Sequence, residues 1–220
     1  ALTRVQSFAP LARRIGLSAT VADQGALQSW LAPVGQEPVA LVLGSAGAAP
    51  NIHILKSADR VPWSGHSARY AIPEVYAAIA QAKMTLIFVN TRSQAEMVFQ
   101  ALWEANEDNL PIALHHGSLD VGQRRKVENA MVEGKLRAVV CTSTLDLGID
   151  WGDVDLVIHM GAPKGSSRLL QRIGRSNHRL DTPSEALLVP SNRFEVLECE
   201  AALQAAKENA QDTEYPAVLK

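Results

Sequence analysis

Seven short runs of apolar, largely β-branched residues recur along the chain, and they constrain its fold more than any other feature. They cover residues 39–43, 52–55, 85–89, 112–114, 138–142, 156–160 and 186–189. Each run is too short for a helix and too apolar for a strand with one solvent-exposed face, so each predicts a buried strand. Stretches with helical periodicity separate several of the runs: residues 93–106, 122–133 and 166–177. This alternation predicts an α/β fold, a parallel sheet with helices on both faces.

The first 45 residues follow a different pattern, which predicts in order a strand, a helix, a strand and a linker of small residues: 14–20, 23–31, 39–43 and 44–50. We interpret residues 1–45 as the end of a preceding domain and 46–192 as a complete α/β domain. Residues 193–220 then predict an exit helix, over 193–211, that leads toward a further domain. The alternative is one α/β domain with a loose N-terminal extension.

Composition excludes several classes of protein. The 21 Lys and Arg residues nearly balance the 23 Asp and Glu residues, so any nucleic-acid site must be local rather than a global basic field. Cys141 and Cys199 have no metal-ligand spacing and suit a reducing compartment, so we expect a cytoplasmic protein. No apolar run approaches the roughly 18 residues of a membrane span, so no membrane partner is expected.

The densest chemical signal lies in residues 156–180, which contain no acidic residue and five basic ones: Lys164, Arg168, Arg172, Arg175 and Arg179. The spacing of the arginines puts them along one helical stripe, where like charges repel. Planar guanidinium groups, by contrast, match phosphate oxygens. The stretch therefore predicts a site for a phosphate-rich ligand. The alternative is a solvated basic face around an apolar stripe.

Polar residues suited to phosphate follow three of the predicted strands, where ligands bind in parallel sheets. After residues 138–142 come hydroxyls at Thr142 and Ser143, then Gly148, which permits close backbone approach, and Asp150, which could bind a ribose hydroxyl or a metal-bound water. Asn90-Thr-Arg92 and His116-Gly-Ser118 follow two other strands. Each loop alone is weak evidence, and the loop after residues 138–142, taken by itself, fits a turn with a helix N-cap better. Together they predict phosphate-binding loops along one sheet.

The P-loop, which binds the phosphates of ATP, is absent from the 220 residues. The one Gly-Lys pair, Gly134-Lys135, has Asn129 where a P-loop needs glycine and Leu136 where it needs Ser or Thr. An acidic D-E-x-H or D-E-x-D box is absent too.

This combination resembles superfamily 2 DExH helicases. The stretches that carry the resemblance correspond, in order, to motifs III, IV, IVa, V and VI: Ser18-Ala-Thr20, Phe88-Val-Asn-Thr-Arg92, His116-Gly117, Thr142 with Gly148-Ile-Asp150, and Gln171-Arg-Ile-Gly-Arg175. Wider segments are similar to the large helicase-related (Lhr-type) branch, and residues 190–197 resemble its DNA-ligase-associated members. The resemblance covers about residues 12–205.

The resemblance implies a fragment of a motor, the end of RecA-like domain 1 followed by the whole of RecA-like domain 2. In this family ATP and Mg²⁺ lie between the two domains and are held mainly by domain 1. Carried over by position, Arg175 and Arg179 would be catalytic arginines that face the phosphates. Gly148 and Asp150 would face the nucleotide.

The resemblance also implies a track for DNA, in particular a single-stranded 3′ tail. By position, the residues along the DNA backbone would be Asn90, Thr91, Arg92, Gly117, Thr142 and Ser143. The other implied partners are domain 1 in the same chain and a DNA-repair ligase system. No metal site within these residues is expected.

Motif VI departs from the commonest pattern of the family, Gly-Arg-x-Gly-Arg. His178 stands where the second arginine would fall, and Arg179 follows one place later, about 100° further round a helix. Either Arg179 swings into the site or His178 takes the position, and we favour Arg179.

The sequence therefore predicts the second motor domain of an ATP-dependent DNA helicase or translocase. The 220 residues alone are expected to hydrolyse no ATP, because they lack the P-loop. A stand-alone nucleic-acid-binding or interaction module is the alternative.

Overall fold

The computed structural model describes residues 2–17, 23–33, 35–44, 48–146, 154–176 and 183–208. The chain divides into two compact units, one built on the first 46 residues and the other on residues 47–209.

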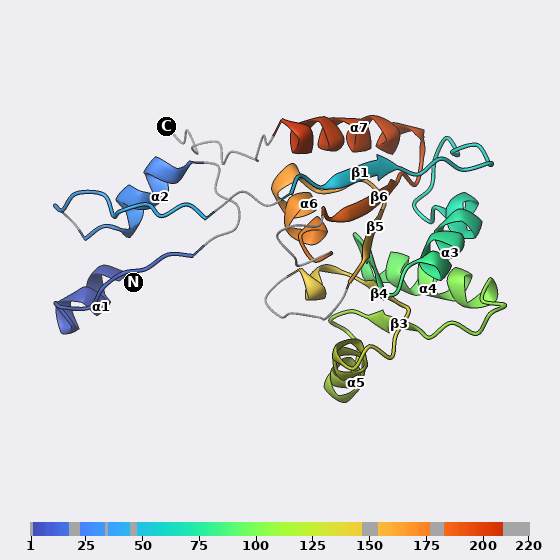
Figure 1. Cartoon of the computed structure of the whole chain (residues 1–220), viewed down its shortest axis with the longest axis horizontal. Coiled ribbons are helices and arrows are strands. Elements are labelled where there is room, and N and C mark those ends of the chain that lie inside the picture. Colours follow the sequence, from blue (N-terminus) through green and yellow to red (C-terminus); the bar gives the residue numbers. More distant parts are fainter. Residues whose placement is uncertain are drawn as a thin grey trace. The chain divides into compact units, whose positions relative to one another are not determined.

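The second unit is built on a six-stranded sheet whose spatial order is β1-β6-β5-β2-β4-β3 (Figure 1). The strands are β1 (Asn51–Ile54), β2 (Thr85–Val89), β3 (Ile112–His115), β4 (Ala138–Cys141), β5 (Leu156–Met160) and β6 (Glu185–Val189). Every pairing is parallel, with Val89 opposite Met160 and Phe88 opposite Cys141. All five residues of β2 are buried, as expected for a strand covered on both faces. The predicted α/β fold with a parallel sheet is confirmed.

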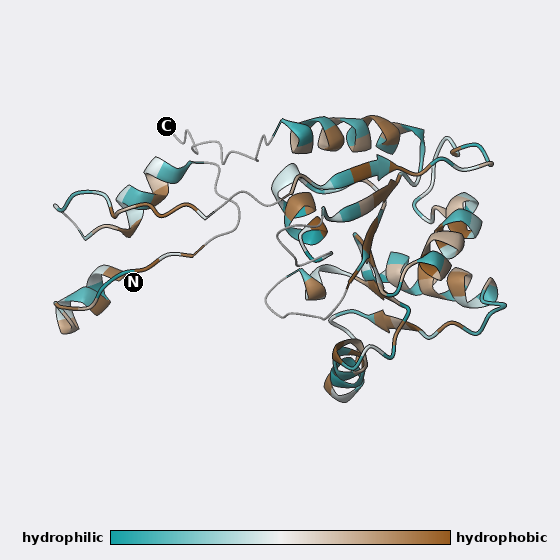
Figure 2. Ribbon diagram, viewed as in Figure 1, coloured by the Kyte–Doolittle hydropathy of each residue, from teal (hydrophilic) through white to brown (hydrophobic). Residues whose placement is uncertain are grey.

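Helices cover both faces of this sheet. On one face, α3 (Ile72–Gln81) and α4 (Arg92–Glu104) bury their apolar residues against the strands. On the other face lie α5 (Val121–Val132), α6 (Ser166–Ile173) and α7 (Arg193–Lys207). Figure 2 shows largely apolar central strands in this sheet, with helices around them in which hydrophilic and apolar residues alternate. In the described part of the chain no helix is both long and apolar enough to cross a membrane.

Side-chain caps begin three of these helices. Thr91 accepts a hydrogen bond from Gln94 N and so caps α4, and Asp120 does the same for α5 through Gly122 N. Asn192 caps α7 by accepting from two backbone N–H groups. Each cap satisfies backbone donors that the first turn leaves free. The caps therefore fix where the chain turns from strand to helix.

The first unit contains two short helices, α1 (Leu2–Phe8) and α2 (Gln24–Leu31), and little core. Among its described residues only Ala32 is buried. Large apolar side chains are exposed throughout: Val5, Phe8, Leu11, Ile15, Leu17, Trp30, Val42 and Leu43. Residues 14–17 and 39–43 are not strands, which corrects the prediction for 39–43 and for the described part of 14–20. Residues 18–20, expected to carry motif III, lie outside the described residues. A strand needs a neighbour to complete its hydrogen bonds, whereas Val39 is bonded to Gln28 of α2.

Other boundaries also differ from the expectations. The helix predicted for 166–177 is shorter, because α6 ends at Ile173 and Gly174 follows in a turn. Helix α3 was not predicted from the sequence. The helix expected over 193–211 is α7, which ends at Lys207, and the last residues of that expectation lie outside the described residues.

Candidate functional site

The loops that follow the parallel strands share the carboxyl edge of the sheet. This edge brings together the six residues predicted to contact nucleic acid. Asn90, Thr91 and Arg92 follow β2, Gly117 follows β3, and Thr142 and Ser143 follow β4. Because β2, β4 and β3 are neighbours in the sheet, the three loops are adjacent.

Arg92 joins the loop after β2 to the loop after β3. Its Nη1 donates to Oγ of Ser118 (3.0 Å), and its Nε lies 3.8 Å from Oε1 of Glu96. Buried His116 shapes the same turn, since its Nδ1 accepts from the Ser118 N–H (3.3 Å) and its Nε2 lies 3.4 Å from Glu96. Gly117 is thus held in a fixed turn beside an exposed guanidinium.

Asn90 and Thr91 are engaged within the protein. The Asn90 side chain donates to the carbonyl of Ala162 (2.8 Å), and its backbone N–H donates to Oε1 of Gln94 (3.0 Å). A Cβ at Gly161, where φ is +90°, would lie 3.1 Å from the Asn90 amide nitrogen, so this close approach needs glycine. Thr91 caps α4. These side chains shape the loop, and their predicted contact with nucleic acid stays a prediction.

Buried His115 connects β3 to the turn after β4, which forms the short 3₁₀ helix η2 (Ser143–Leu145). Its Nδ1 lies 2.8 Å from Oγ1 of Thr144 and its Nε2 lies 3.0 Å from Oε1 of Glu128. Burial lowers the pKa of His115, which favours the neutral ring. That ring donates from Nε2 to Glu128 and accepts at Nδ1 from the Thr144 hydroxyl. The Thr142 N–H also donates to the His115 carbonyl (3.3 Å), so the turn is fixed to β3.

A buried ion pair joins the end of this turn to α6. Arg172 is only 2% exposed, and its Nε donates to Oδ1 of Asp146 (2.8 Å). Its Nη2 lies 3.4 Å from Oδ2 of the same carboxylate. The guanidinium also packs over the Phe88 ring, 4.7 Å from the ring centre. The pair therefore links the segments expected to carry motifs V and VI.

His159 on β5 completes the surroundings of Arg172. Its Nε2 accepts from Nη1 of Arg172 (2.7 Å), and its Nδ1 donates to the carbonyl of Gly161 (3.0 Å). Burial, reinforced by the neighbouring guanidinium, lowers the pKa of His159 to about 3. The ring is therefore neutral and acts as an acceptor for the arginine.

The surroundings of Arg172 differ from both interpretations of the arginine stripe, the phosphate site and the solvated basic face. Residues 156–180 contain no carboxylate, but Asp146, which we did not predict from the sequence, supplies one from outside that stretch. Arg172 is thus neither solvated nor open to a phosphate. Arg168 is exposed, with its Nε 3.9 Å from Oδ2 of Asp146. The signal in the sequence that pointed to Asp146 was an acidic residue two places after the hydroxyl residues 142–144.

Arg175 lies just past the end of α6. Its Nη2 donates to the backbone carbonyl of Asp146 (2.9 Å), while its buried Nε has no hydrogen-bond partner among the described residues. A buried donor without an acceptor is costly, so the site suits an additional anionic ligand such as a phosphate. Gly148, Asp150, His178 and Arg179 lie outside the described residues. Among the residues that the structure describes, the His, Cys, Asp and Glu side chains form no group that could hold a metal ion.

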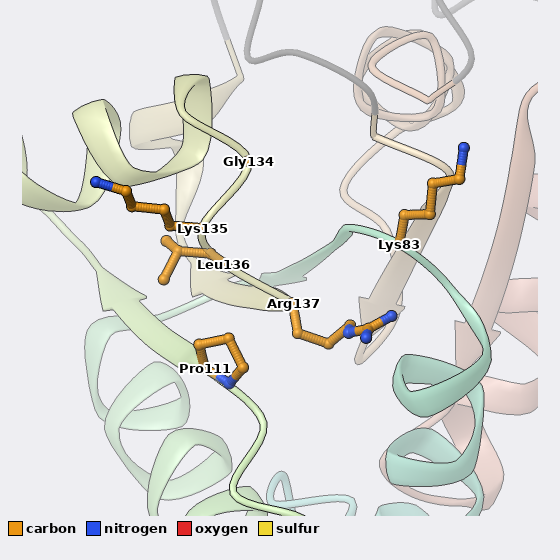
Figure 3. A pocket seen from close by; sticks show the side chains of 6 residues that line it. All are labelled: Lys83, Pro111, Gly134, Lys135, Leu136 and Arg137. Atoms are coloured by element: carbon orange, nitrogen blue, oxygen red, sulfur yellow. The ribbon is translucent and has the colours of Figure 1, made fainter.

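A hollow of about 280 Å³ lies at the opposite edge of the sheet, before β2, β3 and β4. Its lining includes Lys83, Lys135 and Arg137, but Figure 3 shows the two lysine side chains pointing away from each other. Lys135 pairs with Glu133 (2.6 Å), and Arg137 donates to the carbonyl of Ala82 at the end of α3. Lys135 and Arg137 thus stabilise the fold, and the hollow is separate from the carboxyl-edge loops.

Comparison with known proteins identifies similar chains. Residues 70–179 match the family model for the helicase conserved C-terminal domain. The chain is 42% identical over 120 residues to an ATP-dependent helicase Lhr-Core of Methanocaldococcus jannaschii, a match that covers 54% of this chain and 14% of the relative. It is 30% identical over 227 residues to an Lhr helicase and probable uracil glycosylase of Mycolicibacterium smegmatis, covering 88% of this chain and 15% of that one.

A solved structure is also similar, that of the Mycobacterium smegmatis helicase Lhr bound to ssDNA and AMP-PNP. The TM-score is 0.84 at 31% identity, and the match covers 97% of this chain and 29% of that one. The chain thus spans well under a third of the length of these relatives.

We predict that Asp146→Ala lowers the free energy of unfolding by about 3–5 kcal/mol, because it leaves the Arg172 charge buried and unpaired. Urea denaturation measures the loss. Glu133→Ala, which breaks an exposed pair with Lys135, is the control and should cost at most about 1 kcal/mol. Adding Arg172→Met to Asp146→Ala should recover part of the loss. A loss below about 1 kcal/mol for Asp146→Ala would contradict the ion-pair assignment.

We also predict a pH dependence that comes from His159. Its pKa is about 3 in the folded protein against 6.5 ordinarily, so the unfolded chain binds more protons between these values. Stability is therefore full above pH 6.5 and falls as the pH is lowered, by about 2 kcal/mol at pH 5 from this group. Denaturation at a series of pH values should show a flatter dependence for His159→Gln. Equal slopes for the two proteins would argue against a buried neutral ring.

Proposed function

The chain belongs to the helicase conserved C-terminal domain family, within the Lhr-type helicases, and from this premise we propose that it is the second motor domain of an ATP-dependent DNA helicase or translocase. The observation that carries the proposal is the arrangement around Asp146. Arg175, with its buried Nε unpartnered among the described residues, lies against the same turn that His115 ties to the nucleic-acid loops. This arrangement supports the proposal that one edge of the sheet carries both a phosphate-facing arginine and a track for the DNA backbone.

On the nucleotide side, Arg175 supplies positive charge to the γ-phosphate as negative charge develops there in the transition state. Arg179 is the second arginine of this site, and Gly148 and Asp150 face the nucleotide. ATP and Mg²⁺ are held mainly by a first RecA-like domain, whose P-loop and acidic box position the metal and the attacking water. The 220 residues alone hydrolyse no ATP, since they contain neither motif.

On the nucleic-acid side, the exposed guanidinium of Arg92 contacts a phosphate beside Gly117, and Thr142 and Ser143 donate to the next phosphates along the strand. These groups touch backbone rather than base edges, so they position DNA without reading its sequence. The ligand is a single-stranded 3′ tail. Asn90 and Thr91 support the track by holding its loop in shape.

Residues 1–45 are the end of the first RecA-like domain. The exposed apolar side chains of this unit support that assignment, because they lack partners among the described residues. Residues 46–192 are the second RecA-like domain, and α7 leads out of it. Both cysteines are free and buried, which suits the cytoplasm, and the resemblance of residues 190–197 favours a role beside a DNA-repair ligase.

We predict that Arg175→Ala in the full-length protein lowers the ATPase turnover at saturating DNA by about 10³- to 10⁵-fold. DNA affinity should change little, because the arginine acts in the transition state. Arg168→Ala, at an exposed position in the first turn of α6, is the matched control and should retain turnover. Near-normal turnover of Arg175→Ala would discard the arginine-finger assignment.

The same assay separates the two open residues of motif VI. Arg179→Ala should be severe and His178→Ala mild if Arg179 is the second catalytic arginine. The reverse pattern would assign that position to His178.

We further predict that the 220-residue chain binds single-stranded DNA weakly and without sequence preference. The logarithm of the binding constant should fall with the logarithm of salt concentration at a slope of about −0.7 per phosphate contact. Arg92→Ala should make the slope shallower by about 0.7. Lys135→Ala, at the opposite edge of the sheet, should leave it unchanged. Salt-independent affinity, or a strong preference for one base sequence, would refute the backbone track.

A further inference from the structure

The loop between β1 and α3 carries an exposed aromatic ring backed by a cation. Trp63 is 68% exposed, and the guanidinium of Arg193 stacks on its ring at 4.2 Å from the ring centre. Phe194, the next residue of α7, is 66% exposed. We call these three residues the Trp63 platform. With Arg193 on one face of the indole and most of the residue in solvent, the other face is open to a planar ligand.

Hydrogen bonds hold this platform rigid. Four of them tie residues 61–66 to the start of α7 and to α4: Arg193 N to Pro62 O (2.9 Å), Arg193 Nε to Val61 O (3.2 Å), Asn192 Nδ2 to Gly65 O (3.0 Å) and Gln94 Nε2 to His66 O (2.9 Å). Gly65, with φ at +114°, permits the turn that follows the tryptophan. A ligand that stacks on Trp63 therefore pays little entropy for ordering the loop.

The platform lies at the carboxyl edge of the sheet, next to the loops already described. The platform loop follows β1, and the platform residues of α7 follow β6. In the sheet, β6 pairs with β1 and with β5, and β5 in turn pairs with β2 (Figure 1). Gln94 makes the connection direct. Its Nε2 donates to His66 O in the platform loop, while its Oε1 accepts from Asn90 N in the loop that bears Arg92. The buried side chain of Gln94 thus links the two loops.

The charge around the platform favours a polyanion. Lys56 and Arg60 are exposed in the same loop, against one exposed acidic residue, Asp59. Glu195 is occupied, since its carboxylate accepts from two backbone N–H groups, at Ala162 and Ser191. Exposed tryptophan and arginine also suit a protein partner. The continuity with the Arg92 loop and the excess of cations favour nucleic acid instead.

We propose that the Trp63 platform is a stacking site for an unpaired nucleobase, which extends the DNA track past β6 to β1. The inference rests on the proposed function, because the strand must already follow the carboxyl edge. An indole offers its π-face to any base, and a guanidinium behind it adds positive charge for the flanking phosphate. The contact adds affinity without sequence preference, and it depends little on salt because stacking releases no counterions.

The test measures binding of a fluorescein-labelled single-stranded oligothymidylate to the 220-residue chain by fluorescence anisotropy at several salt concentrations. Trp63→Ala should weaken binding roughly 5- to 150-fold, the range that corresponds to about 1–3 kcal/mol for one stacked base. The slope against salt should stay that of the wild type. Trp63→Phe, which keeps an aromatic face, should recover most of the affinity. Trp103→Ala is the matched control, because Trp103 is 61% exposed near the far end of α4.

A second readout locates the contact itself. An oligothymidylate that carries 5-iododeoxyuridine, irradiated in the complex, should crosslink to Trp63, and mass spectrometry of the digest identifies the residue. Crosslinks that avoid residues 61–66 and the start of α7 would overturn the proposal.

The outcomes separate this inference from the proposed function. If the wild type binds and Arg92→Ala weakens it while Trp63→Ala does not, the stacking site is wrong and the backbone track survives. Failure of the wild type to bind would remove the track and the platform together. Unchanged DNA affinity of Trp63→Ala combined with altered self-association in sedimentation would overturn the stacking site and assign the surface to a protein partner.

Discussion

The buried contact between Arg172 and Asp146 governs the rest of the site. A guanidinium that is almost fully removed from water must be neutralised and hydrogen-bonded, or it would cost several kcal/mol. Asp146, in the turn after β4, neutralises the guanidinium, and His159, near the end of β5, accepts a further hydrogen bond from it. Helix α6 therefore docks against the turn after β4. Arg175 is carried along with the helix and meets the Asp146 carbonyl. Arg172, which is buried and does not reach the phosphate site, therefore positions Arg175, the arginine expected to face phosphate.

The parallel sheet imposes the second constraint, since it sends every strand's carboxyl end to one edge. Separate loops become one surface only because side chains bridge them. Arg92 reaches Ser118, His115 reaches Thr144, and Gln94 joins the Asn90 loop to the loop of Trp63. These hydrogen bonds connect neighbouring loops from β3 at one end of the sheet to β1 at the other. Such continuity is what a surface that follows a nucleic-acid backbone requires.

The two units differ in how much structure they can hold by themselves. The unit of residues 47–209 has a buried sheet with an apolar cluster on each face. The first unit has extended segments at 12–17 and 39–43 with exposed apolar side chains. Extended chain becomes a strand only when another strand pairs with it. The apolar pattern of 39–43 therefore did not suffice to predict a strand, because no strand among the described residues pairs with it.

The sequence by itself determined the buried strands, because a short run of large apolar residues has one favourable environment. The runs 85–89 and 156–160 became β2 and β5 with the same bounds. It also placed Arg92, Gly117, Thr142 and Ser143 after strands, and a parallel sheet then had to gather them. Only the tertiary structure decided which of the arginines in this stretch are paired with a carboxylate. Arg172 and Arg175 stand three residues apart in one basic stretch, yet Asp146, distant in sequence, buries the first and meets the second only through its carbonyl. Pairing of a buried charge depends on distance in space, which periodicity and spacing along the chain do not encode.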